Sequence, residues 1–93
     1  MLSKLPIDIQ KIDKETLDKE IARAGMMAEI DAVSFYEQMA VMTDNENIKK
    51  VLLDIAKEEK THIGEFQALL LKLDDEQVIE LKRGRKEVEE LSE

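Results

Sequence analysis

Residues 48–73 read IKKVLLDIAKEEKTHIGEFQALLLKL, and this segment carries the strongest helical pattern in the chain. Alternating steps of four and three residues recur along it, which is the spacing of one face of a helix. The face consists of Ile48, Leu52, Ile55, Glu59, His62, Phe66, Leu69 and Leu73. Only Glu59 and His62 are not apolar, so a helix here turns a carboxylate and an imidazole toward its buried side.

A helix is also predicted before this stretch. Asp13 suits the N-cap of a helix over 13–42, and Thr43 with Glu46 forms the capping-box pattern that starts the next helix at residue 44. Around Glu29 the four-three spacing is occupied by small and apolar residues, namely Ala22, Gly25, Ala32, Tyr36 and Met39. We therefore expect two antiparallel helices, 13–42 and 44–73, with Glu29 facing inward.

The two ends of the chain complete one all-α domain over residues 1–93. The acidic run that begins at Asp74 can cap a shorter third helix over 75–92, which Gly84 weakens in its middle. Residues 1–12 carry the only proline and show no helical period, so we expect an extended arm lying over the body. The contact made by the basic cluster at 82–86 stays open.

The size of the chain points to self-association. A chain of 93 residues builds a small core, and a lone helical hairpin cannot bury both of its faces. Two hairpins that pack together as a four-helix bundle solve this problem. We therefore expect a homodimer as the basic unit.

Composition narrows the chemistry. The chain has 14 basic and 22 acidic residues, and its formal charge of −8 disfavours nucleic acid and anionic membranes as partners. The longest apolar runs, such as residues 68–71, have only four residues and are far shorter than the roughly 20 residues of a membrane span; no signal peptide is apparent, so we expect a cytoplasmic protein. Without cysteine there is no disulfide, thiolate zinc site, iron–sulfur cluster or thiol nucleophile, so a metal would need oxygen and nitrogen ligands.

Three residues could supply such ligands. Glu59 and His62 are three positions apart on one helix face and can converge on one ion, although an isolated Glu-x-x-His is more often an ordinary pair of helix residues. In a hairpin that turns near Asp44, Glu29 and Glu59 lie equally far from the turn and therefore at the same level. We predict a metal site of Glu29, Glu59 and His62, suited to iron or manganese and open to zinc.

One chain supplies too few ligands for two metal ions. Two chains related by a two-fold axis would supply four carboxylates and two imidazoles, which is the ligand set of di-iron helical bundles. We expect two iron ions per dimer interface. Tyr36 lies two turns after Glu29 and is expected on the same inner face, where its hydroxyl could bond a ligand or pass an electron; an ordinary core tyrosine fits equally well.

These residues resemble a known group of proteins. The segments Glu29 to Ala32 and Glu58 to His62, together with Tyr36, are similar to the rubrerythrin and ferritin-like families. A chain with one Glu and one Glu-x-x-His resembles the half-size encapsulated ferritins, over nearly all of residues 13–92. Residues 45–81 also resemble the ferritin-like domain that some archaea fuse to an encapsulin shell protein.

The resemblance implies a fold and an activity. It implies hairpins that pair into a ferritin-like four-helix bundle, with dimers assembled into an open ring such as a decamer. It implies a ferroxidase that oxidises iron(II) with dioxygen or peroxide, with Glu29, Glu59 and His62 as ligands and Tyr36 beside them. Product iron would be mineralised inside an encapsulin compartment.

The sequence departs from the family pattern in two places, and two other functions fit the same residues. Ala28 and Asp31 stand where some relatives place additional carboxylates, so a second metal site on an entry path is not expected. The Gly/Leu-rich tail that docks cargo to a shell is not found at residues 90–93, so encapsulation would either depend on a lost segment or be absent. The alternatives are a di-iron peroxide reductase that takes electrons from a partner protein, and a helical assembly module in which Glu59 and His62 pair without metal.

Overall fold

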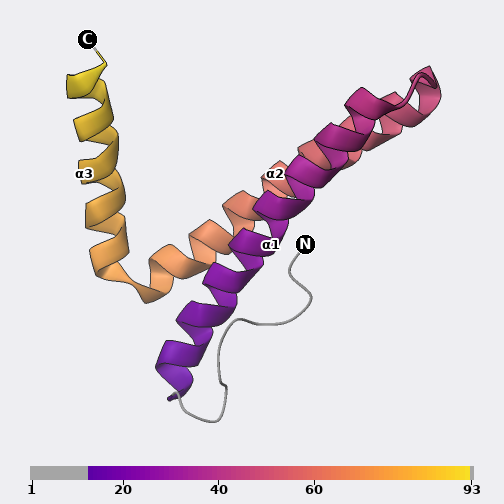
Figure 1. Cartoon of the computed structure of the whole chain (residues 1–93). Helices are drawn as coiled ribbons and strands as arrows, with labels where there is room; N and C mark the ends of the chain where they lie inside the picture. Colours follow the sequence, from indigo (N-terminus) through magenta and orange to yellow (C-terminus); the bar gives the residue numbers. More distant parts are fainter. Residues whose placement is uncertain (1–12, 93) are drawn as a thin grey trace.

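The fold is an antiparallel helical hairpin with a third helix at its open end. A computed structural model describes residues 13–92, and within that range it contains α1 (Lys14–Met42), α2 (Glu46–Leu73) and α3 (Asp75–Leu91) and no strand. In Figure 1, α1 and α2 run side by side from a tight turn, and α3 leaves the other end of α2 in a different direction, giving the molecule a V shape. The predicted all-α architecture is confirmed, whereas the expected arm at 1–12 lies outside the described residues.

Short polar side chains set the beginnings of the helices. As predicted, Asp13 caps α1, and its Oδ1 accepts a hydrogen bond of 2.8 Å from the backbone N–H of Thr16. The predicted start of α2 was wrong. Asn45 is its N-cap, because its Oδ1 accepts from the backbone N–H groups two and three residues ahead, at 3.0 and 3.1 Å. Thr43 instead ends α1, and its Oγ1 accepts a 3.1 Å hydrogen bond from Asn45 N.

The bend between α2 and α3 is held by Asp74. Asp74 ends α2 and caps α3, where its Oδ1 accepts a 3.0 Å hydrogen bond from Gln77 N. Its other carboxylate oxygen lies 3.1 Å from Nη2 of Arg23 on α1, which also bonds Glu20 at 2.7 Å. This bridge ties the base of α3 to the hairpin. Gly84, expected to weaken the helix, does not interrupt it.

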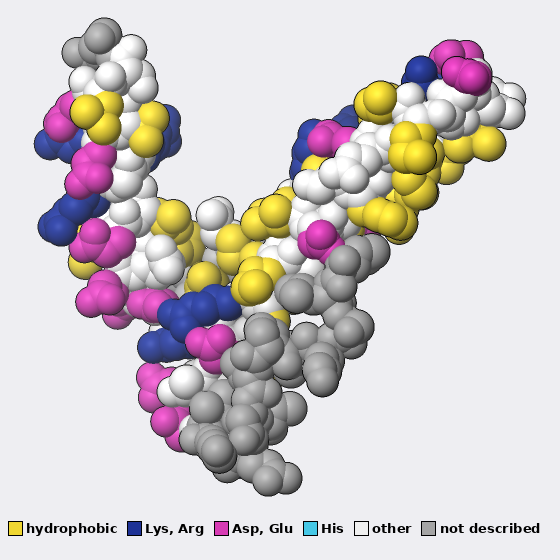
Figure 2. Space-filling view, in the orientation of Figure 1, with side chains coloured by type: hydrophobic (Ala, Val, Ile, Leu, Met, Phe, Trp, Pro, Cys, Tyr) yellow, Lys and Arg dark blue, Asp and Glu magenta, His cyan; other side chains and the backbone are white. Residues whose placement is uncertain are grey.

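Almost no large side chain is buried in the single chain. The buried hydrophobic residues of the described range are Ala22, Ala24, Ala32, Ala40, Ala56 and Leu70. Ile48 and Leu69, predicted to face inward, remain 50% and 53% exposed. Figure 2 shows hydrophobic side chains open to the surface along the hairpin arm. The radius of gyration is 16.6 Å, whereas a compact domain of this length has about 12 Å. The two helices of the hairpin therefore contact each other along one side but do not enclose a core.

None of the three described helices combines the length and apolar character needed to cross a bilayer.

Candidate metal centre

Three predicted ligands converge at the middle of the hairpin. Glu29 lies halfway along α1, and Glu59 and His62 occupy successive turns of α2. Nδ1 of His62 lies 3.5 Å from Oε2 of Glu29 and 3.4 Å from Oε2 of Glu59. Within the described residues these three form the one group of metal-ligand type, with one atom from each lying within 4.8 Å of the other two.

These spacings suit one bound cation. Metal–ligand bonds to carboxylate oxygen and imidazole nitrogen are about 2.0–2.2 Å, so two ligands of one ion lie roughly 3.0–3.5 Å apart. The two distances from the imidazole nitrogen fall at the upper end of that range. A small adjustment of side chains would therefore let all three groups contact one ion.

Burial makes this cluster unusual for carboxylates. The Glu29 and Glu59 side chains are 20% and 19% exposed, and Oε2 of Glu29 is fully buried without a hydrogen bond from any described residue. The hydrogen bond between His62 and Glu59, at 3.4 Å, is well beyond the usual 2.9–3.0 Å. A buried carboxylate oxygen that lacks a donor is costly unless a cation compensates its charge. The donor set therefore fits a hard or borderline metal ion.

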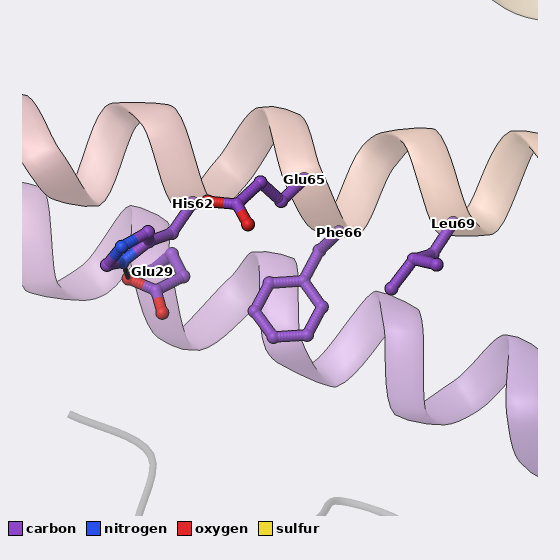
Figure 3. A pocket seen from close by; sticks show the side chains of 5 residues that line it. All are labelled: Glu29, His62, Glu65, Phe66 and Leu69. Atoms are coloured by element: carbon purple, nitrogen blue, oxygen red, sulfur yellow. Dashed lines mark ion pairs between the residues drawn. The ribbon is translucent and has the colours of Figure 1, made fainter.

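An open pocket lies beside the ligands. It has a volume of about 300 Å³ and is lined by Glu29, His62, Glu65, Phe66 and Leu69. Figure 3 shows Glu29 and His62 turned toward each other from facing helices, with the ring of Phe66 extending over α1. The imidazole side chain is 44% exposed, so the ligand cluster is closed by α1 and α2 on one side and open on the other.

A glycine makes room for the aromatic wall of this pocket. A Cβ atom at Gly25 would lie 2.5 Å from two ring carbons of Phe66 and 2.7 Å from a third. The ring therefore lies directly on the α1 backbone, one turn before Glu29. Sequence reasoning placed both residues on inner faces but missed this contact. It named Glu65 among acidic residues that could guide cations near the site, and Glu65 does line the pocket.

The fourth predicted site residue, Tyr36, is not among the residues that line the pocket. It is partly buried, its ring meets that of Phe35 edge-on at 5.6 Å, and its role at a metal stays a prediction. Ala28 and Asp31, at the positions of the expected departure, are both partly buried. Beside the site, Lys60 and Glu37 form an exposed ion pair of 3.1 Å between α2 and α1, which sequence reasoning also missed.

Comparison with known proteins places this arrangement in a family. A sequence profile described as EncFtn-like matches residues 5–82. A ferritin-like–encapsulin shell fusion protein of Pyrococcus furiosus is 59% identical over 73 residues, and the encapsulin nanocompartment cargo protein EncC of Myxococcus xanthus is 34% identical over 76 residues. Each match covers 78% of this chain, but the chain spans only 21% of the first relative and 58% of the second.

A solved structure shares the whole fold. The crystal structure of an encapsulated ferritin domain from Pyrococcus furiosus matches with a TM-score of 0.83 and 49% sequence identity, and the match covers 95% of both chains. The structural match and the sequence profile thus agree over most of the chain. The protein belongs to the EncFtn-like family.

Proposed function

We propose that this chain is a ferroxidase, which oxidises iron(II) to iron(III) at a di-iron site formed between two copies of the hairpin. Each iron(II) is a substrate and gives up one electron, and dioxygen or peroxide accepts the electrons. The observation that carries the proposal is the convergence of Glu29, Glu59 and His62 around a buried carboxylate oxygen that lacks a hydrogen-bond donor.

The ligand count favours a shared site. One chain offers two carboxylates and one imidazole, and a second copy related by two-fold symmetry doubles the set to the inventory of di-iron bundles. The half-exposed His62 also leaves the open side of the cluster available to a second copy. Glu59 or its symmetry mate would contact both ions, and Glu29 and His62 would complete the ligands of each ion.

Each side chain then has a physical task. The carboxylates compensate the charge of the bound ions and favour the more highly charged oxidised pair. His62 is a neutral nitrogen ligand when it binds, and its position between the two glutamates fixes the direction of its ring. Phe66 and Leu69 form an apolar wall that limits water beside the ions.

The relatives support a cellular setting. The names of two of them describe encapsulin cargo and an encapsulin shell fusion. We propose that this chain works as a homo-oligomer built from dimers, such as a decamer, inside an encapsulin nanocompartment of the cytoplasm. Iron(III) would be mineralised in the compartment, because an open helical ring has no storage cavity of its own.

An anaerobic iron(II) titration followed by addition of dioxygen or peroxide tests the activity. We expect wild-type protein to bind iron near one ion per chain and to oxidise it in a fast phase. Glu59→Gln and His62→Ala should lose both the bound iron and the fast phase. Glu58→Gln, the same change one residue away on the exposed side of α2, is the matched control and should keep them.

Two outcomes would defeat the proposal. Wild-type oxidation rates in a variant that binds no metal would place the chemistry elsewhere. Faster turnover with peroxide plus an external reductase than with iron(II) plus oxidant would identify a peroxide reductase.

A further inference from the structure

The imidazole of His62 turns only one of its two ring nitrogens toward the ligand cluster. Nδ1 makes both contacts with glutamate, at 3.5 Å to Glu29 and 3.4 Å to Glu59. Nε2 lies on the other side of the ring, and within residues 13–92 it has no hydrogen bond or ion pair. The second nitrogen is therefore available for another role.

A metal ion bound at Nδ1 would decide what Nε2 does. A histidine ligand binds metal as the neutral imidazole, so its single proton must lie on the other nitrogen. Histidine ligands almost always donate that proton to a carboxylate, a backbone carbonyl or a water molecule. The acceptor fixes the orientation of the ring and makes the ligand nitrogen more basic. An iron(II) ion held by the three ligands therefore requires an acceptor beside Nε2.

Glu65 is placed to be this acceptor. Of the described residues that line the pocket with His62, it has the one carboxylate that is not already assigned as a ligand. Side chains on a helix lean toward its N-terminus, so a glutamate three residues after a histidine reaches back toward the imidazole. In Figure 3 the carboxylate of Glu65 is turned along α2 toward His62. No hydrogen bond or ion pair within the described residues occupies it.

The other nearby carboxylates suit Nε2 less well. Glu58 precedes His62 by four residues, so its side chain leans away from the imidazole. It is exposed and does not line the pocket. Glu37 on α1 is already paired with Lys60 at 3.1 Å. Position and direction together therefore favour Glu65.

We infer that Glu65 is a positioning residue, which accepts a hydrogen bond from Nε2–H of His62 when Nδ1 binds metal. This inference rests on the proposed function, because it takes His62 as a metal ligand. Glu65 does not contact the ion, but it holds the imidazole in one tautomer and one orientation. The ligand motif on α2 is thereby extended to Glu-x-x-His-x-x-Glu.

Nuclear magnetic resonance can observe this hydrogen bond directly. The chain has a single histidine, so labelling with ¹⁵N-histidine reports His62 alone. Zinc is the probe, because it takes oxygen and nitrogen ligands without redox chemistry. Two-bond ¹H–¹⁵N spectra of the zinc-loaded protein distinguish the metal-bound nitrogen from the protonated one. We expect zinc at Nδ1 and, at Nε2, a proton that exchanges slowly with water.

Three variants separate the hydrogen bond from the effect of charge. Glu65→Leu removes the acceptor, so the protected Nε2–H signal should be lost and zinc affinity, measured by chelator competition, should fall by roughly 10–100-fold. Glu65→Gln retains a carbonyl oxygen, so it should keep the protected proton and lose less affinity. Glu58→Leu removes the same charge from the same helix and should change neither. Circular dichroism and light scattering show whether each variant keeps its fold and mass.

Each result decides the inference. Loss of the protected proton in Glu65→Leu, but not in Glu65→Gln or Glu58→Leu, together with weaker zinc binding, supports it. A protected proton that survives Glu65→Leu would assign the acceptor to another group, and zinc at Nε2 would reverse the roles of the two nitrogens; either overturns it. Equal losses of affinity in Glu65→Leu and either other variant would show that charge matters and the hydrogen bond does not, which overturns it too, as does wild-type protein that binds no zinc.

Iron(II) oxidation measured on the same samples separates the two proposals. Wild-type protein that oxidises iron(II) but has an unprotected Nε2–H removes only the role of Glu65. Wild-type protein that has the protected proton with zinc but does not oxidise iron(II) removes only the ferroxidase.

Discussion

Replacing Gly25 with alanine gives a sharp test of the packing beside the metal centre. Glycine inside a helix costs about 0.5–1 kcal/mol relative to alanine, so the substitution should stabilise a helix that has room for the new methyl group. Gly25 has no such room, because the added Cβ would lie 2.5 Å from the ring of Phe66. The ring must shift or tilt, and overpacking of this kind costs about 1–3 kcal/mol.

The two effects together predict a net loss. We expect Gly25→Ala to lower the free energy of unfolding by about 1 kcal/mol. Gly64→Ala, a control in α2 where a Cβ meets no atom within 4 Å, should raise it by about 0.5–1 kcal/mol. Urea denaturation followed by circular dichroism, at one fixed protein concentration because assembly contributes to stability, measures both changes.

A double-mutant cycle assigns the loss to the aromatic ring. With Phe66→Ala in the background, Gly25→Ala should become as favourable as the control, because no ring remains to displace. The reasoning is refuted if Gly25→Ala alone stabilises the protein as much as Gly64→Ala does. In that event the ring does not lie on α1.

Two further predictions concern the helix caps. Asn45→Ala should lower the free energy of unfolding by about 1 kcal/mol in urea denaturation. Thr43→Val should lower it by less, because it removes one hydrogen bond at the end of α1. Equal losses would indicate that Thr43 is the N-cap of α2. Asp13 accepts a hydrogen bond from the backbone N–H of Thr16, which has the larger effect, and another from its side chain. Together they hold the pKa of Asp13 below its ordinary value of 3.8. Because this lowered pKa favours the charged form in the folded state, its stabilisation is present above pH 3.8 and is lost as the pH falls below it. Asp13→Asn, which keeps an acceptor but does not titrate, should show a shallower loss of stability on acidification, and an unchanged acid profile would contradict this.

The hairpin and its ligand cluster follow from sequence because both rest on local periodicity. Glu59 and His62 occupy positions that a 3.6-residue period assigns to a buried face, and equal distance from the turn places Glu29 at their level. The geometry agrees with that prediction, since Nδ1 of His62 lies within 3.5 Å of both carboxylates. The helical period determines which residues share a face, even when a helix end is predicted one or two residues away from its true position. The wrong prediction of the cap at Thr43 therefore did not affect the prediction that the ligands lie together.

Features that depend on tertiary contacts did not follow from the sequence. The direction of α3 depends on Asp74, which caps that helix and also accepts a hydrogen bond from Arg23, 51 positions earlier. A helical period says nothing about such a distant pair. The overlap of Phe66 with Gly25 depends likewise on how closely two backbones approach. Both features depend on how two helices approach each other, and the spacing of residues along one helix contains no information about its neighbour.

The thin core and the ligand cluster, which is open on one side, have one physical explanation under the proposed assembly. A hairpin whose buried hydrophobic residues are mostly alanine gains little free energy from packing within one chain, because each alanine side chain buries little apolar area. The open face of α2 adds burial only when a second copy covers it, and the same contact brings four carboxylates close together. Association without cations would then be opposed by like charges, and any ion that binds only the paired state would stabilise it by about 2.7 kcal/mol at a hundred times its dissociation constant. Iron(II) would thus act as substrate and as an assembly ligand, and the apolar contacts would hold the register in which its ligands meet.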